Sequence, residues 1–547
     1  MKSPDSLNNR KIDATLIIKK GLGYSLPSIL ATILILMDVL SYGRSIMKNI
    51  QGADEGEITN INMSIHLYST IISQIISSLI TTIKGGVLTT PIIEIYPIIQ
   101  NIQEICTNFK DSKEFIISNT FTCMFCSIIF LAIITLIFIY FKITNIINFL
   151  PRPILLGFLL MVGIKQMEMG YDSIKYNSGY LFIILLIIFS IGAYLIDLFL
   201  PSIFIPGYII LLIGGIHLIL RGVVGLSLNE MTRNGWIGKK ESTQLSIQLI
   251  YKYFRVSELS LEVIFKNSIN MLSIAIMSLI YLPLKLSTFE ITMNTPIDYT
   301  KEYYSNLFMN LGSSLVFLPT RISPTYSIMF NKFGATNRIN SFISSIMLVS
   351  IAFYGTMIKY YIPNVIIGVF PFYIGISFCL SSLYAPIKII NLSEYIIMLL
   401  CACFCYFFGT AKGIFFGIIS YVFLFSYYYL KEIGFEKSDS IKISEDMSYF
   451  SINKIILSFN VIKIIKCLDN SQKDVDIVLD FSTCRIVDYT SAILIIDRLK
   501  KDKTSNNRNI YWIGEPKNIK LGSYCNGLGL CQKYEVDLKN KFEHMSL

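Results

Sequence analysis

The chain has little charge, few histidines and no recognisable catalytic or nucleotide-binding motif. Charged residues make up 15% of its 547 residues, against roughly 25% in soluble globular proteins. The histidines are His66, His217 and His544, and none stands at a catalytic spacing from a serine and an acidic residue. Neither a G-x-G-x-x-G motif nor a P-loop is present. These absences exclude a cytosolic enzyme, a disordered protein and a nucleic-acid scaffold, so we expect no enzymatic activity and no nucleic-acid partner.

The cysteines give no sign of a metal or redox centre. There are eleven, and most of them lie inside apolar runs. Cys123 and Cys126 form a C-x-x-C pair within the apolar run 122–141. A zinc site needs four ligands, and no second pair of ligands lies nearby. We therefore predict neither a metal nor a cofactor.

Long apolar runs dominate the sequence, and hydrophobic residues make up 53% of it. Runs long enough to span a membrane occur at 22–47, 64–83, 115–141, 178–200, 203–224, 262–284, 338–358, 362–383 and 394–430. The last run is too long for one helix, and we expect it to break at 409–413. The first is too long for a cleavable signal peptide. The chain is therefore predicted to be a polytopic membrane protein surrounded by the lipid bilayer.

Three further segments are short or interrupted by glycine and proline, namely 85–102, 151–170 and 303–333. Their freed backbone groups would have no partners against lipid, so such segments belong inside a helix bundle. One in each half of the chain is typical of transporters built from two inverted repeats. Counting the broken segments, we predict about 14 helices. We also predict that 85–102 and 303–333 are short helices whose N-termini meet near the middle of the bilayer.

The loop charges predict that both termini are cytoplasmic. An even number of helices places both termini on one side, and basic residues gather in the loops of that side while the opposite loop 48–63 is acidic. The basic residues concerned are Lys84, Lys142, Arg152, Lys332, Arg338 and Lys388. The loop 225–261 carries several lysines and arginines against this assignment, but it is long enough for the rule to weaken.

The composition changes after residue 430. A charged linker at 431–440 is followed by a predicted strand at 475–481, an amphipathic helix at 491–501 and a second strand at 509–513. This pattern predicts a small soluble α/β domain in which Val478 and Phe481 are buried. The predicted organisation is a cytoplasmic N-terminus at 1–21, a transmembrane transport domain at 22–430, the linker at 431–440 and the α/β domain at 441–547.

Five motifs in the membrane part and one in the tail resemble the SulP family of sulfate permeases. The membrane motifs lie at 38–43, 150–158, 298–302, 326–338 and 361–376, and they resemble the family's D-A-x-x-Y-G/A, FPRxxLxG, D-x-x-x-E, NSxLFxxxGGxxR and YVPxxxxGxLxxxLGI. In the tail, 480–492 resembles the core of the family's STAS domain, a strand followed by an I-D-x-S/T loop. The resemblance implies a seven-plus-seven membrane domain that works by elevator-like alternating access. It further implies a homodimer that carries sulfate or another small anion.

Two residues of the tail motif have a role implied by this resemblance. Thr490 falls where the family's regulatory serine or threonine lies, and Asp488 precedes it by two residues. We therefore take both as candidate regulatory residues. Helix capping by either side chain is the alternative interpretation.

The membrane part departs from the sulfate-carrying members at helix ten. Those members commonly have a Ser-Arg pair there, whereas the aligned residues here are Thr325-Tyr326 or Tyr326-Ser327. Arg321 lies just upstream and could reach the same place. Residues 85–97 resemble a fungal vacuolar branch, RGGxxxxxxEVVPF, that is associated with basic amino acids.

Glu94 is the first candidate for a substrate contact because an ionisable group on a short membrane segment is functional by default. A carboxylate there opposes an anion and favours a cation or a proton, whereas facing helix N-termini suit an anion. The substrate-binding candidates are Glu94, Tyr42, Thr325, Tyr326 and Ser327. The alternatives are a structural partner role for Glu94 and ordinary helix packing for the others.

Three functions remain open from the sequence. The first is a SulP-type secondary active transporter of sulfate or another small anion, in the plasma or vacuolar membrane. The second is a proton-coupled transporter of basic amino acids into a vacuole-like compartment. The third is a non-transporting membrane anchor whose STAS domain binds a partner. The broken segments speak against an anchor, because an anchor has no need of them.

Overall fold

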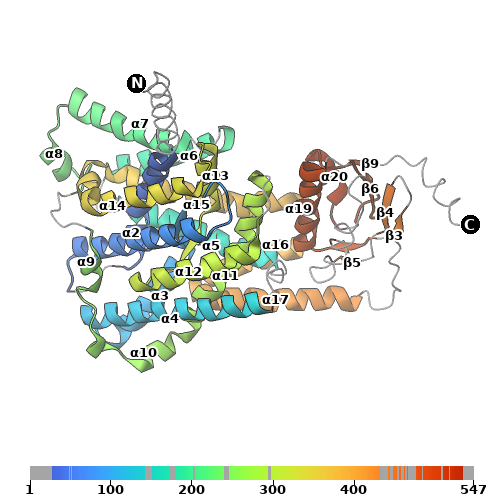
Figure 1. Cartoon of the computed structure of the whole chain (residues 1–547), viewed down its shortest axis with the longest axis horizontal. Helices are drawn as coiled ribbons and strands as arrows, with labels where there is room; N and C mark the ends of the chain where they lie inside the picture. Colours follow the sequence, from blue (N-terminus) through green and yellow to red (C-terminus); the bar gives the residue numbers. More distant parts are fainter. Residues whose placement is uncertain are drawn as a thin grey trace, which may run out of the picture. The chain divides into compact units, whose positions relative to one another are not determined.

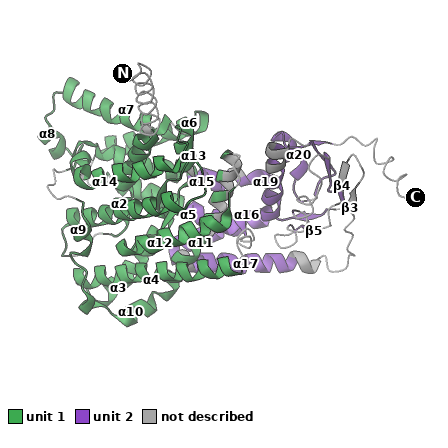
Figure 2. Cartoon of the chain, viewed as in Figure 1, with its two compact units in different colours: residues 1–145, 162–377 green, residues 146–161, 378–547 purple. Residues whose placement is uncertain are grey.

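The computed structural model divides the chain into two compact units (Figure 2). Unit 1 comprises residues 1–145 and 162–377, and unit 2 comprises residues 146–161 and 378–547. The structure describes residues 27–48, 50, 52–141, 151–172, 174, 179–200, 204–238, 245–293, 297–431, 441–443, 447–451, 455–456, 461, 465, 476–482, 484–506, 509–516 and 518–533. The predicted N-terminal segment 1–21 and residues 432–440 of the predicted linker lie outside these residues.

Unit 1 is built almost entirely of helices (Figure 1). It begins with a helical segment Pro27–Ser45 that ends in the 3-10 turn η1 (Gly43–Ser45). The elements that follow in the first half are α2 (Glu55–Ile80), β1 (Thr89–Pro91), η2 (Ile93–Ile95), α3 (Tyr96–Phe109), α4 (Lys113–Tyr140), α5 (Arg152–Asp172), α6 (Tyr180–Phe199), α7 (Ile205–His217) and η5 (Leu218–Val223). Residues 152–161 of α5 belong to unit 2. The next are α8 (Leu228–Arg233), α9 (Ile247–Tyr251), η6 (Val256–Glu258), α10 (Leu261–Lys266), α11 (Ser268–Met293), α12 (Tyr299–Ser313), η7 (Ser314–Val316), β2 (Thr320–Ile322), α13 (Pro324–Lys332), α14 (Arg338–Tyr361) and α15 (Asn364–Leu383).

Several of these helices are long and apolar enough to cross a membrane. In the described part of the chain there are seven, at Pro27–Ser45, Glu55–Ile80, Lys113–Tyr140, Arg152–Asp172, Tyr180–Phe199, Arg338–Gly355 and Asn364–Lys388. Shorter apolar helices lie at Gly207–Val223, Ser268–Leu279, Leu392–Phe408 and Lys412–Tyr427. These helices agree with a multi-pass membrane protein, while the count of about 14 and the inverted repeat stay predictions.

The structure corrects the prediction for 151–170. This segment was expected to be interrupted because it begins with Pro151 and Pro153. Instead α5 is one continuous helix of 21 residues. Pro153 is its second residue, where the helix has no use for a backbone N–H, so proline is tolerated there.

The other two segments are interrupted as predicted, but 303–333 is not a single short helix, because it holds most of α12 as well as β2 and α13. In both segments a short helix, α3 or α13, follows a short strand. Strand β1 pairs antiparallel with β2, with Thr90 opposite Arg321. The helix α3 begins at Tyr96, directly after η2, and α13 begins at Pro324, two residues after β2. The two chain breaks therefore meet at a strand pair, while their depth in the bilayer stays a prediction.

Side chains of neighbouring helices satisfy the backbone of this strand pair. Gln74 of α2 accepts a hydrogen bond from the Thr89 N–H at 2.6 Å. Asn310 of α12 accepts from the Thr320 N–H at 2.8 Å and donates to the Thr320 carbonyl at 3.0 Å. Backbone groups that leave the helical pattern inside a membrane protein need such partners. The strand pair is therefore an internal feature of unit 1.

Glycines set the closest contact between α5 and α15. A Cβ atom added to Gly170 would lie 2.7 Å from the carbonyl oxygen of Gly368, and one added to Gly368 would lie 2.5 Å from the carbonyl oxygen of Gly170. Small residues at such crossings let helix backbones approach closely in membranes. The same contact recurs along these helices between Gly163 and Gly375.

Unit 2 joins a helix pair to an α/β domain. Its described elements are η8 (Ala385–Lys388), α16 (Leu392–Phe408), α17 (Thr410–Lys431), β3 (Ile441–Ile443), β4 (Met447–Ser451), β5 (Ile455–Ile456), β6 (Asp476–Asp480), β7 (Ile486–Val487), α19 (Tyr489–Asn506), β8 (Ile510–Ile513), α20 (Leu521–Gly527) and β9 (Gln532–Lys533). Gly409 separates α16 from α17 with φ of 95°, a conformation that favours glycine. The break predicted at 409–413 is thereby confirmed.

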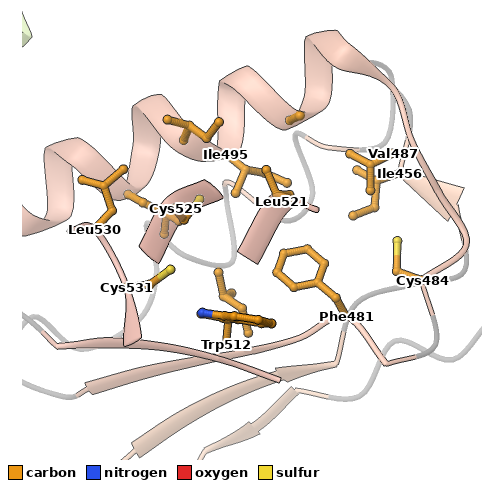
Figure 3. Packing of buried hydrophobic residues seen from close by; sticks show 14 of the residues in the cluster. Ile456, Phe481, Cys484, Val487, Ile495, Trp512, Leu521, Cys525, Leu530 and Cys531 are labelled. Carbon is orange, nitrogen blue, oxygen red and sulfur yellow. The ribbon is translucent and has the colours of Figure 1, made fainter. Parts of the chain in front are cut away.

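The α/β domain has a five-stranded sheet in the order β3-β4-β6-β8-β9. The pairs β4–β6, β6–β8 and β8–β9 are parallel, and β3 is antiparallel to β4. Helices α19 and α20 pack their apolar residues on this sheet, where Phe481, Trp512, Ile495 and Leu521 form part of the core (Figure 3). Parallel strands with covering helices are the expected arrangement for such a pattern.

The tail predictions agree closely with these elements. The predicted strands at 475–481 and 509–513 are β6 and β8, and the burial of Val478 and Phe481 is confirmed. Helix α19 begins at Tyr489, two residues before the predicted start, because the Asp488 carboxylate accepts a hydrogen bond from the Ser491 N–H at 2.9 Å. The domain boundary predicted at 431–440 falls within unit 2, since residues 378–431 cluster with the α/β domain.

A glycine substitution at the α5–α15 crossing tests this packing. In Gly368→Ala the new methyl group collides with the Gly170 carbonyl, and we expect a loss of about 1–3 kcal/mol of stability. The loss is measured as a lower apparent Tm of the detergent-purified protein by size-exclusion chromatography after heating. Gly214→Ala on α7 is the matched control, because nothing lies within 4 Å of its added Cβ. An equal loss in both variants would contradict the crossing.

Candidate substrate site

Glu94 lies in the single turn η2 between β1 and α3, and it forms a buried ion pair. Its Oε1 atom is 2.7 Å from Nη2 of Arg321, the middle residue of β2. The side chains of Glu94 and Arg321 are 1% and 12% exposed. The pair therefore joins the two broken segments by charge as well as by strand pairing. Arg321 reaches the site from upstream of the helix-ten motif.

A second buried acid belongs to the first helical segment. Oδ1 of Asp38 accepts a hydrogen bond from the Tyr326 hydroxyl at 2.7 Å, and both residues are buried. Tyr326 is the third residue of α13, so this bond ties the first helix to the start of α13. Asp38 and Tyr326 lie 288 residues apart in the sequence.

Tyr42 lies one helical turn after Asp38 and is also buried. Its ring packs edge-on against Phe370 of α15, with ring centroids 5.9 Å apart. Asp38 and Glu94 both contribute to the electrostatic environment of its hydroxyl. Among the described residues this hydroxyl has no hydrogen-bond partner. A buried polar group without a partner is costly, so Tyr42 is a good candidate for contact with a bound solute.

The cluster holds more acid than base. Asp38 and Glu94 contribute two carboxylates, and Arg321 contributes one guanidinium. With both acids ionised, the cluster has an excess of one negative charge. A buried, uncompensated charge is strongly disfavoured, so the cluster calls for a bound cation or a proton.

The two other predicted substrate contacts are Ser327 and Thr325. The Ser327 hydroxyl accepts from the Leu88 N–H at 2.9 Å, which gives it a structural contact with the other broken segment. Thr325 is the second residue of α13, and its side chain lies outside the described part of the structure. Substrate contact by Tyr42, Glu94, Thr325, Tyr326 and Ser327 stays a prediction.

Sequence reasoning missed Tyr96 and His66. Tyr96 is the first residue of α3, and Asp38, Glu94 and Arg321 all act on it electrostatically. Its hydroxyl is 2.8 Å from Nδ1 of His66 on α2. The position of Tyr96 between Glu94 and Pro97 was the available signal. His66 offered none, because α2 is a long apolar helix with no break in its pattern.

The D-x-x-x-E motif, Asp298 and Glu302, stabilises the start of α12 and its contact with the residues that follow α2. Asp298 caps α12 by accepting from the Lys301 N–H at 3.2 Å. The buried carboxylate of Glu302 accepts from the Thr82 N–H at 2.7 Å and from the hydroxyls of Thr81 and Thr82. Three donors satisfy this acid, in contrast to the acids of the substrate site.

The candidate regulatory residues lie where the α/β domain meets the helices of unit 2. The Thr490 hydroxyl is buried and accepts from the Arg152 N–H at the start of α5, at 3.0 Å. Asp488 accepts from the Tyr421 hydroxyl of α17 at 2.8 Å, in addition to capping α19. Capping by Asp488 is therefore present, and regulation by Asp488 and Thr490 stays a prediction.

Further polar contacts surround these two residues within unit 2. Glu394 in the first turn of α16 accepts from the Tyr489 N–H at 3.2 Å. Arg152 pairs with Asp497 of α19 at 3.1 Å. The starts of α5 and α16 and the middle of α17 thus contact α19 or its N-cap through charged or buried polar groups. Such networks are sensitive to the loss of one member.

The membrane part matches a known family. Residues 174–403 match the model of the Sulfate permease family. The class of protein defined by the fold is a helical, multi-pass membrane protein, and its residues 174–403 are similar to the Sulfate permease family. The match ends at residue 403, and the assignment of the tail as a STAS domain stays a prediction.

One curated relative aligns with most of this chain at low sequence identity. The vacuolar basic amino acid transporter VSB1 of Saccharomyces cerevisiae is 23% identical over 433 residues. That alignment covers 73% of this chain, and the chain spans 40% of the length of VSB1.

Solved structures share the fold. The transmembrane domain of a cyanobacterium bicarbonate transporter, BicA, aligns with a TM-score of 0.52 and 13% identity, over 73% of this chain and 97% of that one. SLC26A9 aligns with a TM-score of 0.52 and 11% identity, over 95% of this chain and 91% of that one. The murine Slc26a9 anion transporter in its inward-facing state aligns with a TM-score of 0.50 and 12% identity, over 90% and 85%. At these identities the likeness shows the fold alone.

The contact between α17 and α19 offers a test within unit 2. In Tyr421→Phe the Asp488 carboxylate loses a hydrogen bond, and such bonds to charged groups contribute about 1.5–3 kcal/mol. We expect amide hydrogen exchange in the first turn of α19 to accelerate by roughly ten-fold or more. Tyr427→Phe, at an exposed position of the same helix, is the control. Unchanged exchange in Tyr421→Phe would show that the hydroxyl does not stabilise this contact.

Proposed function

We propose that this chain is a secondary active transporter whose central site takes a basic amino acid in exchange for protons. The observation that carries the proposal is the buried cluster at the β1–β2 pair, in which Asp38 and Glu94 face a single arginine, Arg321. A basic amino acid carries one net positive charge, and that charge matches the excess negative charge of the cluster.

An inorganic anion fits this cluster poorly. The guanidinium of Arg321 is already paired with Glu94 at 2.7 Å. An anion placed beside it would face the carboxylates of Glu94 and Asp38, and like charges in a low-dielectric site repel strongly. A basic amino acid therefore fits the cluster better than a small anion, although the sequence analysis placed anion transport first.

The site also offers complementary groups for the two ends of an amino acid. The N-termini of α3 and α13 carry partial positive charge, which suits the α-carboxylate. The carboxylate of Asp38 suits an ammonium or guanidinium group. The rings of Tyr42, Tyr96 and Tyr326 are buried around it, and aromatic faces attract cations.

Asp38 is the acid best placed to exchange a proton for the substrate. The partner described for its carboxylate is the neutral hydroxyl of Tyr326, whereas Glu94 is held by a charged guanidinium. An ionised Asp38 binds the cationic substrate, and a protonated Asp38 does not. Competition of this kind couples substrate movement to a proton gradient.

The relative VSB1 supports the choice of substrate class, since it is named for basic amino acids and a vacuolar membrane. By the same likeness we propose a vacuole-like membrane as the location. Alternating access of an elevator type and a homodimeric assembly belong to this proposal as well. The α/β tail, with Asp488 and Thr490, would regulate or assemble the transporter.

The second candidate function is transport of sulfate, bicarbonate or another small anion. It is favoured by the two helix N-termini beside the strand pair and by the presence of Arg321. A non-transporting anchor is the least supported, because a buried ion pair between two broken helices serves no purpose in an anchor.

Uptake into proteoliposomes distinguishes these functions. The purified chain is reconstituted, and radiolabelled arginine, lysine, sulfate and bicarbonate are supplied with and without a pH gradient. We expect uptake of arginine and lysine that depends on the pH gradient. Uptake of sulfate or bicarbonate alone would favour the anion function, and no uptake of any solute would favour the anchor.

Glu94→Gln gives opposite results for the two transport functions. The substitution keeps size and hydrogen bonding but neutralises the cluster and releases Arg321. For a cationic substrate we expect KM to rise by about ten-fold or more, since breaking a buried charge pair costs roughly 2–5 kcal/mol. For an anionic substrate KM should fall. The measurement is initial uptake rate against substrate concentration.

Two further variants control this experiment. Glu302→Gln also removes a buried acid, but one that is satisfied by Thr81 and Thr82 outside the cluster, and it should leave substrate preference unchanged. Asp38→Asn should abolish the dependence on the pH gradient. Unchanged KM and pH dependence in folded, inserted Glu94→Gln and Asp38→Asn would refute the acidic site.

A further inference from the structure

His66 is a buried titratable group that has no role in the transport mechanism proposed above. It lies within α2 and is 0% exposed. Its Nδ1 atom is 2.8 Å from the hydroxyl oxygen of Tyr96, and the two rings are nearly perpendicular, with centroids 6.4 Å apart. Among the described residues its Nε2 atom has no hydrogen-bond partner.

The imidazole of His66 is neutral in this arrangement. Its hydrogen-bond partner is a hydroxyl, and no carboxylate contacts it among the described residues. Burial disfavours the charged form of such a group. A neutral imidazole has one N–H donor and one lone-pair acceptor, so the tautomer decides whether Nδ1 donates to Tyr96 or accepts from it.

Two observations favour the tautomer with the proton on Nδ1. Tyr96 follows Glu94 by two residues, and carboxylates outnumber the guanidinium in the cluster of Asp38, Glu94 and Arg321. The excess negative charge turns the hydroxyl proton of Tyr96 toward the cluster and leaves its oxygen to accept from Nδ1–H. The other tautomer would leave a buried N–H at Nε2 without an acceptor, which is rarer in proteins than an unpaired acceptor.

We propose that His66 is a positioning residue that fixes the Tyr96 hydroxyl as a hydrogen-bond donor inside the substrate site. Tyr96 is the first residue of α3, where the N–H groups of the helix start are already donors. A fixed hydroxyl donor there adds to the groups that hold a carboxylate, such as the α-carboxylate of an amino acid. The identity of that ligand rests on the proposed function, whereas the His66–Tyr96 bond does not.

Titratable and charged side chains lie on the elements that pack against α2. They include Arg44 on η1, Tyr251 on α9, Glu302 and Tyr303 on α12, Arg321 on β2, and Arg338, Lys359 and Tyr360 on α14. Asp38, Tyr42, Glu94 and Tyr96 are the other such groups of the substrate site. Among the described residues, the hydrogen bond given for His66 side-chain atoms is the one to Tyr96. The proposed role therefore acts through Tyr96.

The bond itself is tested without any substrate. Nitrogen NMR of the full chain labelled with 15N-histidine reports the tautomer of His66, assigned by comparison with His66→Leu. We expect a neutral imidazole with Nδ1 protonated, and a change of that signal in Tyr96→Phe. A signal that is protonated at Nε2 or is insensitive to Tyr96→Phe would overturn the proposal, whatever the chain transports.

The role in binding is tested by uptake with four variants, using arginine for a basic-amino-acid transporter or the solute that the wild type carries. His66→Leu and Tyr96→Phe should each raise KM by about ten-fold, the scale of one hydrogen bond to a charged group, with little change in maximal rate. The double variant should be no worse than either single one, because both remove the same interaction. His66→Asn places an amide near the position of Nδ1 and should restore KM to within about three-fold.

The pH profile separates positioning from proton transfer. Because neutral His66 only orients Tyr96, the pH profile of uptake in His66→Asn should superimpose on that of the wild type. A flattened profile in that variant would overturn the proposal and make His66 a proton carrier. Additive effects of His66→Leu and Tyr96→Phe would also overturn it. Failure of arginine uptake by the wild type would refute the proposed function alone.

Discussion

The pairing of β1 with β2 is the constraint on which the rest of unit 1 depends. Two segments from opposite halves of the chain leave the helical pattern, so their backbone groups need partners that lipid cannot supply. They satisfy part of this need with each other, and Gln74 and Asn310 satisfy the remainder at Thr89 and Thr320. Because α3 and α13 start directly after the strands, the pairing also fixes where two helix N-termini lie.

The ion pair between Glu94 and Arg321 largely decides the net charge beside the strand pair. An arginine beside helix N-termini would make an anion site, and its neutralisation by Glu94 removes that charge. Asp38 then leaves the cluster with an acidic excess, held in place by Tyr326. The fold thus supplies the two helix N-termini, while the side chains around them decide the net charge of the cluster.

Unit 2 joins its α/β domain to helices through polar as well as apolar contacts, since Leu156, Ile389 and Ile390 pack with the core of that domain. The polar contacts link the start of α19 to the starts of α5 and α16 and to the middle of α17, and they involve Thr490, Asp488, Glu394 and Arg152. Buried polar contacts specify one arrangement more sharply than apolar contacts of similar area, because each unsatisfied group is costly. A change at Thr490 or Asp488 acts directly on this junction.

The sequence by itself determined the elements whose signal is local. Hydropathy located the membrane helices and proline and glycine marked the broken segments, because both effects act within a few residues. The same local reasoning identified Glu94 and the tail strands. It failed for 151–170, because Pro151 and Pro153 lie at the start of α5, where proline is tolerated. Only the tertiary structure decided the partners of Glu94, Asp38 and His66, because contacts between distant segments depend on how helices pack and leave no periodic trace in either segment.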